Sequence, residues 1–242
     1  MFLKYKNNWL LFNQKKPCVL CRQTTENPDA ICSGCAADLP WLTLCCNRCA
    51  LPLNSTPEHP TLCPDCLKKP PPFTQIIAPF EYRFPIDQMI LQAKFNNRSY
   101  LLPPLAYLLA DKLKQSMTEH SRIPDLIIAV PLHPSRLLER QYNQSAILAK
   151  IVAQQLNIPL SNNLLIKQNK TPHQASLDHK TRQKNLKDSF RCLSTPPTSV
   201  AIIDDVVTTA ATVTEISRLL LRKGCQNVDI WAIARTGKEL FF

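Results

Sequence analysis

Cysteines are the first side chains whose type and spacing could do chemistry. The chain has eleven, and eight of them form four Cys-x-x-Cys pairs: Cys18 with Cys21, Cys32 with Cys35, Cys46 with Cys49, and Cys63 with Cys66. A two-residue gap lets both sulfurs of a pair bind one metal ion. Two pairs complete a tetrahedral site with metal–sulfur distances near about 2.3 Å. Four pairs between residues 18 and 66 therefore predict two closed, structural zinc sites.

The cysteine pattern allows two other interpretations. A redox dithiol would need one Cys-x-x-Cys at the start of a helix in a strand–helix–strand context, which this region does not offer. Unliganded core cysteines would not explain four equal spacings. The spacing does not say which pairs share an ion: a sequential grouping is the simplest, and an interleaved grouping stays open. Gly34, inside the second pair, is expected to have a positive φ.

Acidic and hydroxyl residues follow a strongly apolar run near the end of the chain. Residues 200–212 read Val-Ala-Ile-Ile-Asp-Asp-Val-Val-Thr-Thr-Ala-Ala-Thr. The carboxylates of Asp204 and Asp205 could accept hydrogen bonds from a ribose diol or hold a hydrated Mg²⁺ ion. Residues 208–212 are here called the phosphate loop; they are Thr208, Thr209, Ala210, Ala211 and Thr212. Their backbone N–H groups and hydroxyls could bind a phosphate at the start of a helix. In the alternative interpretation, Thr212 only caps a helix, in a capping box with Glu215, and the acids are solvated.

The elements around these residues alternate between strand and helix patterns. Apolar runs predict strands at residues 76–82, 126–130, 200–203 and 228–234, while helical spacing predicts helices at 86–95, 101–117 and 145–156. A further helix is expected from Thr212 to just before Gly224. The stiff segment at residues 69–72 places a domain boundary at residue 70, between a cysteine module (1–70) and a second domain (71–242). Alternating strands and helices indicate an α/β domain with a mainly parallel sheet, whose ligands bind beyond the carboxyl ends of the strands.

The composition of the chain indicates where the protein is located and what kind of partner it binds. No run approaches the length needed to cross a bilayer, and residues 9–12 do not form a secretory signal, so no membrane insertion and a cytoplasmic location are expected. Thiolate metal ligands fit the same reducing compartment. The formal net charge of +11 favours polyanionic partners such as nucleic acid, although many basic proteins bind none.

A basic, polar segment lies between the second and third predicted strands. It could cover a phosphorylated ligand or follow a nucleic-acid backbone, and an ordinary solvated surface is an equal alternative. Its cationic residues are Lys167, Lys170, Lys180, Arg182, Lys184, Lys187 and Arg191.

Several short segments in one order resemble the bacterial ComF family, which includes the GntX proteins. These segments are residues 131–136, 140–144 and 174–177, then Arg182 and Asn185, the stretch 200–212, and the pair Ala234-Arg235. The resemblance implies a type I phosphoribosyltransferase-like parallel sheet preceded by a zinc-ribbon module. It further implies that Asp204 and Asp205 contact the ribose of phosphoribosyl pyrophosphate (PRPP), bound with Mg²⁺, while the phosphate loop holds its 5′-phosphate. Pyrophosphate would face Ser135, Arg136 and Arg140.

The chain departs from that family pattern at two positions. The family's phosphate loop reads Thr-Thr-Gly, whereas position 210 is Ala, and its Arg-Gly-Phe-Asn-Gln segment has Gln141 in place of Gly. Glycine allows positive φ and close backbone approach, so these changes bear on PRPP binding and turnover. With three glycines in 242 residues, the chain is glycine-poor throughout.

Three functions are compatible with the sequence. The resemblance implies a competence protein that handles single-stranded DNA in the cytosol during natural transformation, with partners in the DNA-uptake machinery. A second hypothesis is an active phosphoribosyltransferase on an unknown acceptor, in which Arg136 stabilises departing pyrophosphate and catalysis comes mainly from charge placement. A third is a domain that binds PRPP or a related sugar phosphate without turnover.

Overall fold

A computed structural model describes residues 15–53, 62–117, 123–168 and 189–237. Its elements, in chain order, are β1 (Lys16–Pro17), β2 (Thr24–Thr25), α1 (Ser33–Ala37), α2 (Pro64–Lys68), β3 (Gln75–Ile77), β4 (Phe80–Glu81), α3 (Ile86–Phe95), η2 (Ser99–Leu101), α4 (Leu102–Ser116), β5 (Leu126–Ala129), α5 (Pro134–Arg140), α6 (Gln144–Leu156), β6 (Leu160–Ser161), β7 (Leu165–Lys167), β8 (Phe190–Cys192), β9 (Ser199–Val207), α8 (Ala211–Arg222) and β10 (Asn227–Arg235). No helix among these residues is long and apolar enough to cross a membrane.

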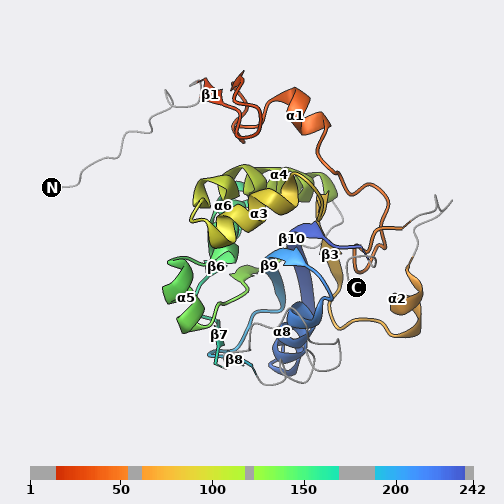
Figure 1. Cartoon of the computed structure of the whole chain (residues 1–242). Coiled ribbons are helices and arrows are strands. Elements are labelled where there is room, and N and C mark those ends of the chain that lie inside the picture. The colour runs from red at the N-terminus through yellow and green to blue at the C-terminus, as the bar shows by residue number, and fades with distance from the viewer. Residues whose placement is uncertain (1–14, 54–61, 118–122, 169–188, 238–242) are drawn as a thin grey trace.

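A parallel sheet forms the centre of the molecule. Its strand order is β3-β10-β9-β5-β6, and β4 continues the pairing along β10. Helices α3, α4 and α6 cover one face, and α8 covers the other (Figure 1). Because both faces are covered, β9 begins as a run of fully buried aliphatic residues, from Val200 to Ile203. The predicted α/β fold with a mainly parallel sheet is confirmed.

The two cysteine groups pack on different parts of this domain. Cys18, Ile31 and Leu39 join the hydrophobic cluster that includes α3, α4 and α6, and Figure 1 shows this part of the chain above α4. Cys46, Cys63 and Cys66 instead join the cluster of β3, β10 and α8. The boundary at residue 70 stays a prediction.

The predicted elements differ from the observed ones in two places. The strand expected at 76–82 is split into β3 and β4, since the carbonyl of Pro79 accepts a hydrogen bond from the N–H of Leu42 at 2.8 Å and the chain bends there. The strand expected at 200–203 continues to Val207 and so carries both acids within it. Gly224 follows α8 with φ of 101°, as predicted for the residue after a helix end.

Candidate metal centres and phosphate loop

The eight paired cysteines form two groups of four sulfurs. Within each group all sulfurs lie within 4.8 Å of one another, and the grouping is sequential along the chain: Cys18, Cys21, Cys32 and Cys35, here called the first cysteine site, and Cys46, Cys49, Cys63 and Cys66, the second cysteine site. The Sγ–Sγ distance is 3.6 Å both between Cys21 and Cys32 and between Cys49 and Cys63. A tetrahedral zinc ion with bonds of about 2.3 Å places its sulfurs about 3.8 Å apart. Both groups therefore fit structural zinc.

Each site combines a tight turn with a helix start. After the first pair of each site the chain turns through a residue with positive φ, Arg22 at 69° and Ala50 at 52°. Their N–H groups donate to the carbonyls of Cys18 and Cys46, at 2.9 and 2.8 Å. The second pair of each site opens a short helix, α1 or α2. The positive φ expected at Gly34 was wrong, because Gly34 lies inside α1.

Backbone donors favour ionised sulfur at both sites. The N–H of Cys32 points to Sγ of Cys18 at 3.4 Å, and the N–H of Cys63 points to Sγ of Cys46 at 3.2 Å. Burial opposes ionisation of Cys18, but donors from Cys21, Cys32 and Leu20 outweigh it and lower its pKa to about 6. Similar donors overcome burial at Cys46 and lower its pKa to about 7. Thiolates are the form that binds zinc.

The two acids of β9 have different surroundings. Asp204 accepts a hydrogen bond from the hydroxyl of Ser145, at the start of α6, at 3.2 Å. Asp205 forms an ion pair with Lys94, in the last turn of α3, with 2.8 Å between Nζ and Oδ2. The side chains of Lys94 and Asp205 are only 20% and 9% exposed. One carboxylate is therefore neutralised by the protein itself, and the other is not.

The pKa of Asp204 is raised to about 7. Loss of hydration is the main cause and the charge of Asp205 adds to it, while Lys94 and the hydrogen bonds from the Asp205 N–H and Ser145 act in the opposite direction. Near neutral pH the Asp204 side chain thus exchanges between a neutral acid and a carboxylate. A ligand that needs its carboxylate must displace that proton.

A pH dependence of stability follows from this pKa. The folded protein keeps the Asp204 proton up to about pH 7, whereas the unfolded chain releases it near about pH 4. The free energy of unfolding should therefore fall as pH rises from 4 to 7, by at most about 1.4 kcal/mol per pH unit from this group. Asp229, whose pKa burial raises to about 6, contributes in the same direction. Urea unfolding of wild type and Asp204→Asn between pH 4.5 and 8 isolates the Asp204 part; parallel curves for the two proteins would contradict it.

The phosphate loop connects β9 to α8 through a left-handed residue. Ala210 has φ of 59° and is the N-cap of α8, and the N–H of Ala211 points to the hydroxyl of Thr209 at 3.4 Å. The predicted capping box was wrong, since Thr212 lies inside the helix rather than at its cap. The first N–H groups of a helix have no partner within it. Gln141, the other position where the family pattern has glycine, also has a positive φ, at 63°.

Restoring glycine in the phosphate loop should stabilise the protein. Ala210→Gly removes the steric cost of a left-handed alanine and should raise the free energy of unfolding by about 1 kcal/mol. The matched control is its neighbour: Ala211→Gly, at a right-handed helical position, should lower it by about 0.5–1 kcal/mol. Urea unfolding of the two variants measures both signs. Destabilisation by both substitutions would argue against a strained loop.

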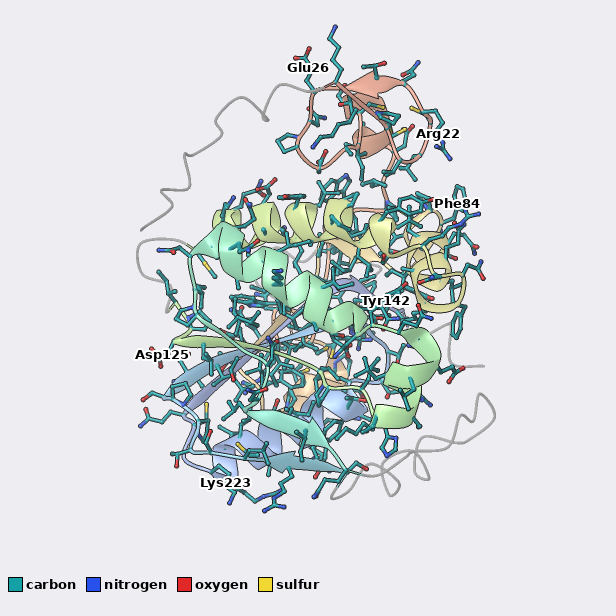
Figure 2. All side chains as sticks on the ribbon, turned by 90° about the vertical axis from the view of Figure 1, so that its left-hand side faces the viewer. Arg22, Glu26, Phe84, Asp125, Tyr142 and Lys223 are labelled. Atoms are coloured by element: carbon teal, nitrogen blue, oxygen red, sulfur yellow. The ribbon has the colours of Figure 1, made fainter. Side chains whose placement is uncertain are left out.

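Residues 131–144 continue the same edge of the sheet. His133 caps α5, with its Nδ1 2.8 Å from the hydroxyl of Ser135. Asn143 caps α6 and donates to the carbonyl of Val130 at 3.0 Å. Tyr142, labelled in Figure 2 where α5 meets α6, donates to the carbonyl of Ala93 in α3. The segment is thus fixed to β5 and to α3.

The predicted cationic residues of this edge are placed as follows. Arg136 lies in α5 and is close enough to Lys167 for the two charges to interact, while Asp204 attracts Lys167. Arg140 lies 5.1 Å from the centre of the Phe95 ring, and its Nη1 is 3.5 Å from Oε1 of Gln144. Lys167 and Arg191 lie on the antiparallel pair β7–β8, with Lys167 5.4 Å from the Phe190 ring centre. Lys170, Lys180, Arg182, Lys184 and Lys187 lie outside the described residues.

Three residues at this edge were not predicted as site residues. Lys94 and Ser145 contact the acids from helices distant in the chain, and Arg235, at the end of β10, donates to the carbonyl of Thr208, the first residue of the phosphate loop. Lys94 had no sequence signal, because a lysine in the last turn of a helix is common. The sequence did carry a signal for Arg235, because this charged residue directly follows the apolar run from Ile230 to Ala234.

The comparisons with known proteins cover both parts of the chain. The model of the double zinc ribbon domain matches residues 9–69. The DNA utilization protein YhgH of Salmonella typhimurium is 35% identical over 223 residues, which cover 90% of this chain and 96% of the relative. The competence protein F of Haemophilus influenzae is 32% identical over 224 residues, with the same two coverages.

Solved structures with a similar arrangement include phosphoribosyltransferases. A glutamine PRPP amidotransferase from B. subtilis is 18% identical with a TM-score of 0.35, covering 53% of this chain and 25% of that protein. A purine phosphoribosyltransferase from Pyrococcus horikoshii is 17% identical with a TM-score of 0.33, covering 56% and 83%.

Proposed function

Because this chain belongs to the ComF/GntX family, with competence protein F and the DNA utilization protein YhgH as relatives, we propose that it is a cytoplasmic ComF-type competence protein. In this proposal its α/β domain binds PRPP with Mg²⁺, and the protein handles single-stranded DNA during natural transformation. The two cysteine sites hold structural zinc and take no part in chemistry, since four thiolates leave no open coordination position.

One observation carries the ligand part of the proposal. The acids of β9, the phosphate loop and the start of α8 follow one another at the carboxyl edge of a parallel sheet, where ligands of such sheets bind. Ala210 keeps the left-handed conformation that glycine adopts readily. The loop can therefore turn its N–H groups toward an anion although the glycine of the family pattern is missing.

Different residues at this edge would bind different parts of the ligand. The hydroxyls of Thr208, Thr209 and Thr212 and the first N–H groups of α8 would hold the 5′-phosphate. Asp204 would accept from a ribose hydroxyl or hold hydrated Mg²⁺, which would supply positive charge to the diphosphate oxygens. Carboxylate oxygens are suitable donors for that ion. Asp205, paired with Lys94, would fix the position of the ribose side rather than supply a free charge.

A specific observation favours turnover as a second candidate. Arg136 lies in α5, which follows the carboxyl end of β5 at this edge of the sheet, and Lys167 ends β7; these two cations would supply the positive charge that departing pyrophosphate needs. Pyrophosphate release from Mg-PRPP, measured with and without candidate nucleobase acceptors, tests this activity. Equal release by wild type and by the Asp204→Asn, Asp205→Asn double variant would overturn it, and binding without release would leave the non-catalytic role.

The DNA part of the proposal rests on charge and on the relatives. Fluorescence anisotropy with a labelled single-stranded oligonucleotide should show binding whose affinity falls steeply as salt rises, because phosphate contacts release counterions. A duplex of the same sequence is the comparison that measures any preference for the single strand. No binding of the single strand at low ionic strength would overturn this part while leaving the ligand part intact.

A further inference from the structure

Arg235 lies buried between the second cysteine site and the phosphate loop. It is the last residue of β10 and is 5% exposed. Its Nε donates to the carbonyl of Cys49 at 2.9 Å. Its Nη1 donates to the carbonyl of Val207 at 3.0 Å and also to that of Thr208. One rigid guanidinium therefore bonds a metal-ligand residue on one side and the start of the phosphate loop on the other.

The charge of Arg235 has an unusual balance. None of the ion pairs among the described residues includes Arg235, so its nearest partners are carbonyl dipoles. Its Nε bonds the backbone of Cys49, one of the four cysteines of the second cysteine site. Four thiolates around one zinc ion carry a formal net charge of about −2. Loaded with zinc, the second cysteine site would supply the anion that compensates this buried cation.

We propose that Arg235 is a positioning residue through which the second cysteine site holds the phosphate loop in its binding conformation. Zinc in that site and a phosphorylated ligand on the loop then stabilise each other. This inference rests on the function proposed above for the loop. No hydrogen bond among the described residues connects the first cysteine site to the phosphate loop, and this site packs instead with the cluster of α3, α4 and α6.

A second arginine beside the same site, Arg48, is half-buried and offers a matched control. Arg48 lies within the same Cys-x-x-Cys turn, and its Nη2 donates to the carbonyls of Pro71 and Phe73, both at 3.2 Å. Its own carbonyl accepts from the N–H of Ile76 at 2.9 Å. Arg48 therefore ties the second cysteine site to β3, and Arg235 ties it to the loop. Lysine at either position keeps the charge but loses the fork of donors.

Amide hydrogen exchange of the ligand-free protein tests the connection without any ligand. In zinc-loaded Arg235→Lys, the amides of Thr214 and Thr236, which donate to the carbonyls of Ala210 and Val207 at 2.9 and 3.2 Å, should exchange at least about fivefold faster than in wild type, the low end of typical couplings. The amides of α4 and α6 should keep their protection. Arg48→Lys should leave the exchange of the Thr214 and Thr236 amides unchanged. Unchanged exchange in Arg235→Lys, or equal acceleration in both variants, would overturn the inference.

A second measurement uses a protein with only the second cysteine site and no change at Arg235. In Cys21→Ser, Cys35→Ser, the affinity for the remaining zinc, measured at equilibrium by competition with a coloured chelator, should rise at least about fivefold when Mg-PRPP is added, because coupling between two sites is reciprocal. The matching protein with only the first site, made by Cys49→Ser, Cys66→Ser, should show no change. PRPP that binds by calorimetry without raising the zinc affinity would overturn the inference. PRPP that does not bind would instead overturn the proposed function, and the exchange experiment would still decide on Arg235.

Discussion

Replacing Cys66 with serine is expected to remove one zinc ion per chain. The free energy of unfolding of the α/β domain should fall by at least about 3 kcal/mol, because metal binding at a structural site is coupled to folding. Cys66 is buried, and its site shares a hydrophobic cluster with Phe73 and with Val213 of α8. Losing the ion therefore loosens the packing against the central sheet itself.

The matched change at the first cysteine site should have a smaller effect on that domain. Cys35→Ser also removes one zinc, but Cys35 is partly exposed and its site lies above α4 (Figure 1). We expect the α/β domain to lose less stability than in Cys66→Ser, because Cys21 is exposed and Cys32 and Cys35 are partly exposed, whereas all four cysteines of the second site are buried. Zinc content by atomic emission and urea unfolding by circular dichroism measure both effects. Equal destabilisation by the two variants would contradict the different roles assigned to the two sites.

The two acids of β9 should respond in opposite ways to the same substitution. Asp205→Asn leaves Lys94 as an uncompensated cation with 20% exposure, which should lower the free energy of unfolding by about 3 kcal/mol. Asp204→Asn removes a carboxylate that is costly to ionise and should stabilise the protein at pH 8. Both variants should bind Mg-PRPP at least about tenfold more weakly, which corresponds to about 1.4 kcal/mol.

Asp125→Asn is the control for this pair. Asp125 precedes β5 at the opposite edge of the sheet, on the other side of Figure 2 from Tyr142, and its Oδ2 accepts from the N–H of Ser199 at 2.9 Å. The substitution weakens one hydrogen bond and should not change PRPP affinity. Urea unfolding and calorimetry on the three variants separate stability from binding. Destabilisation by Asp204→Asn at pH 8, or unchanged affinity in both acid variants, would contradict the roles given to the acids.

Local spacing predicted much of this structure. Four equal cysteine spacings predicted two four-sulfur groups because the ligand geometry of zinc is strict. The apolar run that begins at Val200 predicted the central strand because a strand buried on both faces excludes polar side chains. The phosphate loop begins directly after that strand. Predicting the strand therefore also predicted at which edge of the sheet the candidate site lies.

Tertiary contacts explain what the sequence did not reveal. Lys94 reaches Asp205 across 111 positions of the chain, and no local pattern encodes such a pair. The left-handed conformation falls on Arg22, Ala50, Gln141 and Ala210 rather than on Gly34. Glycine is the usual sequence signal for a positive φ, and this chain has few glycines. At these turns the surrounding packing imposes a conformation that the residue type disfavours, so the sequence did not reveal them.

Calorimetric titration of the zinc-loaded chain with Mg-PRPP tests most directly whether residues 208–212 form a binding site for a sugar phosphate. We expect saturable binding to one site per chain, of similar affinity in Ala210→Gly because Ala210 already has the left-handed conformation, and at least about tenfold weaker in Asp204→Asn. An absence of binding by both the wild type and Ala210→Gly, with two zinc ions retained, would contradict the proposed ligand site.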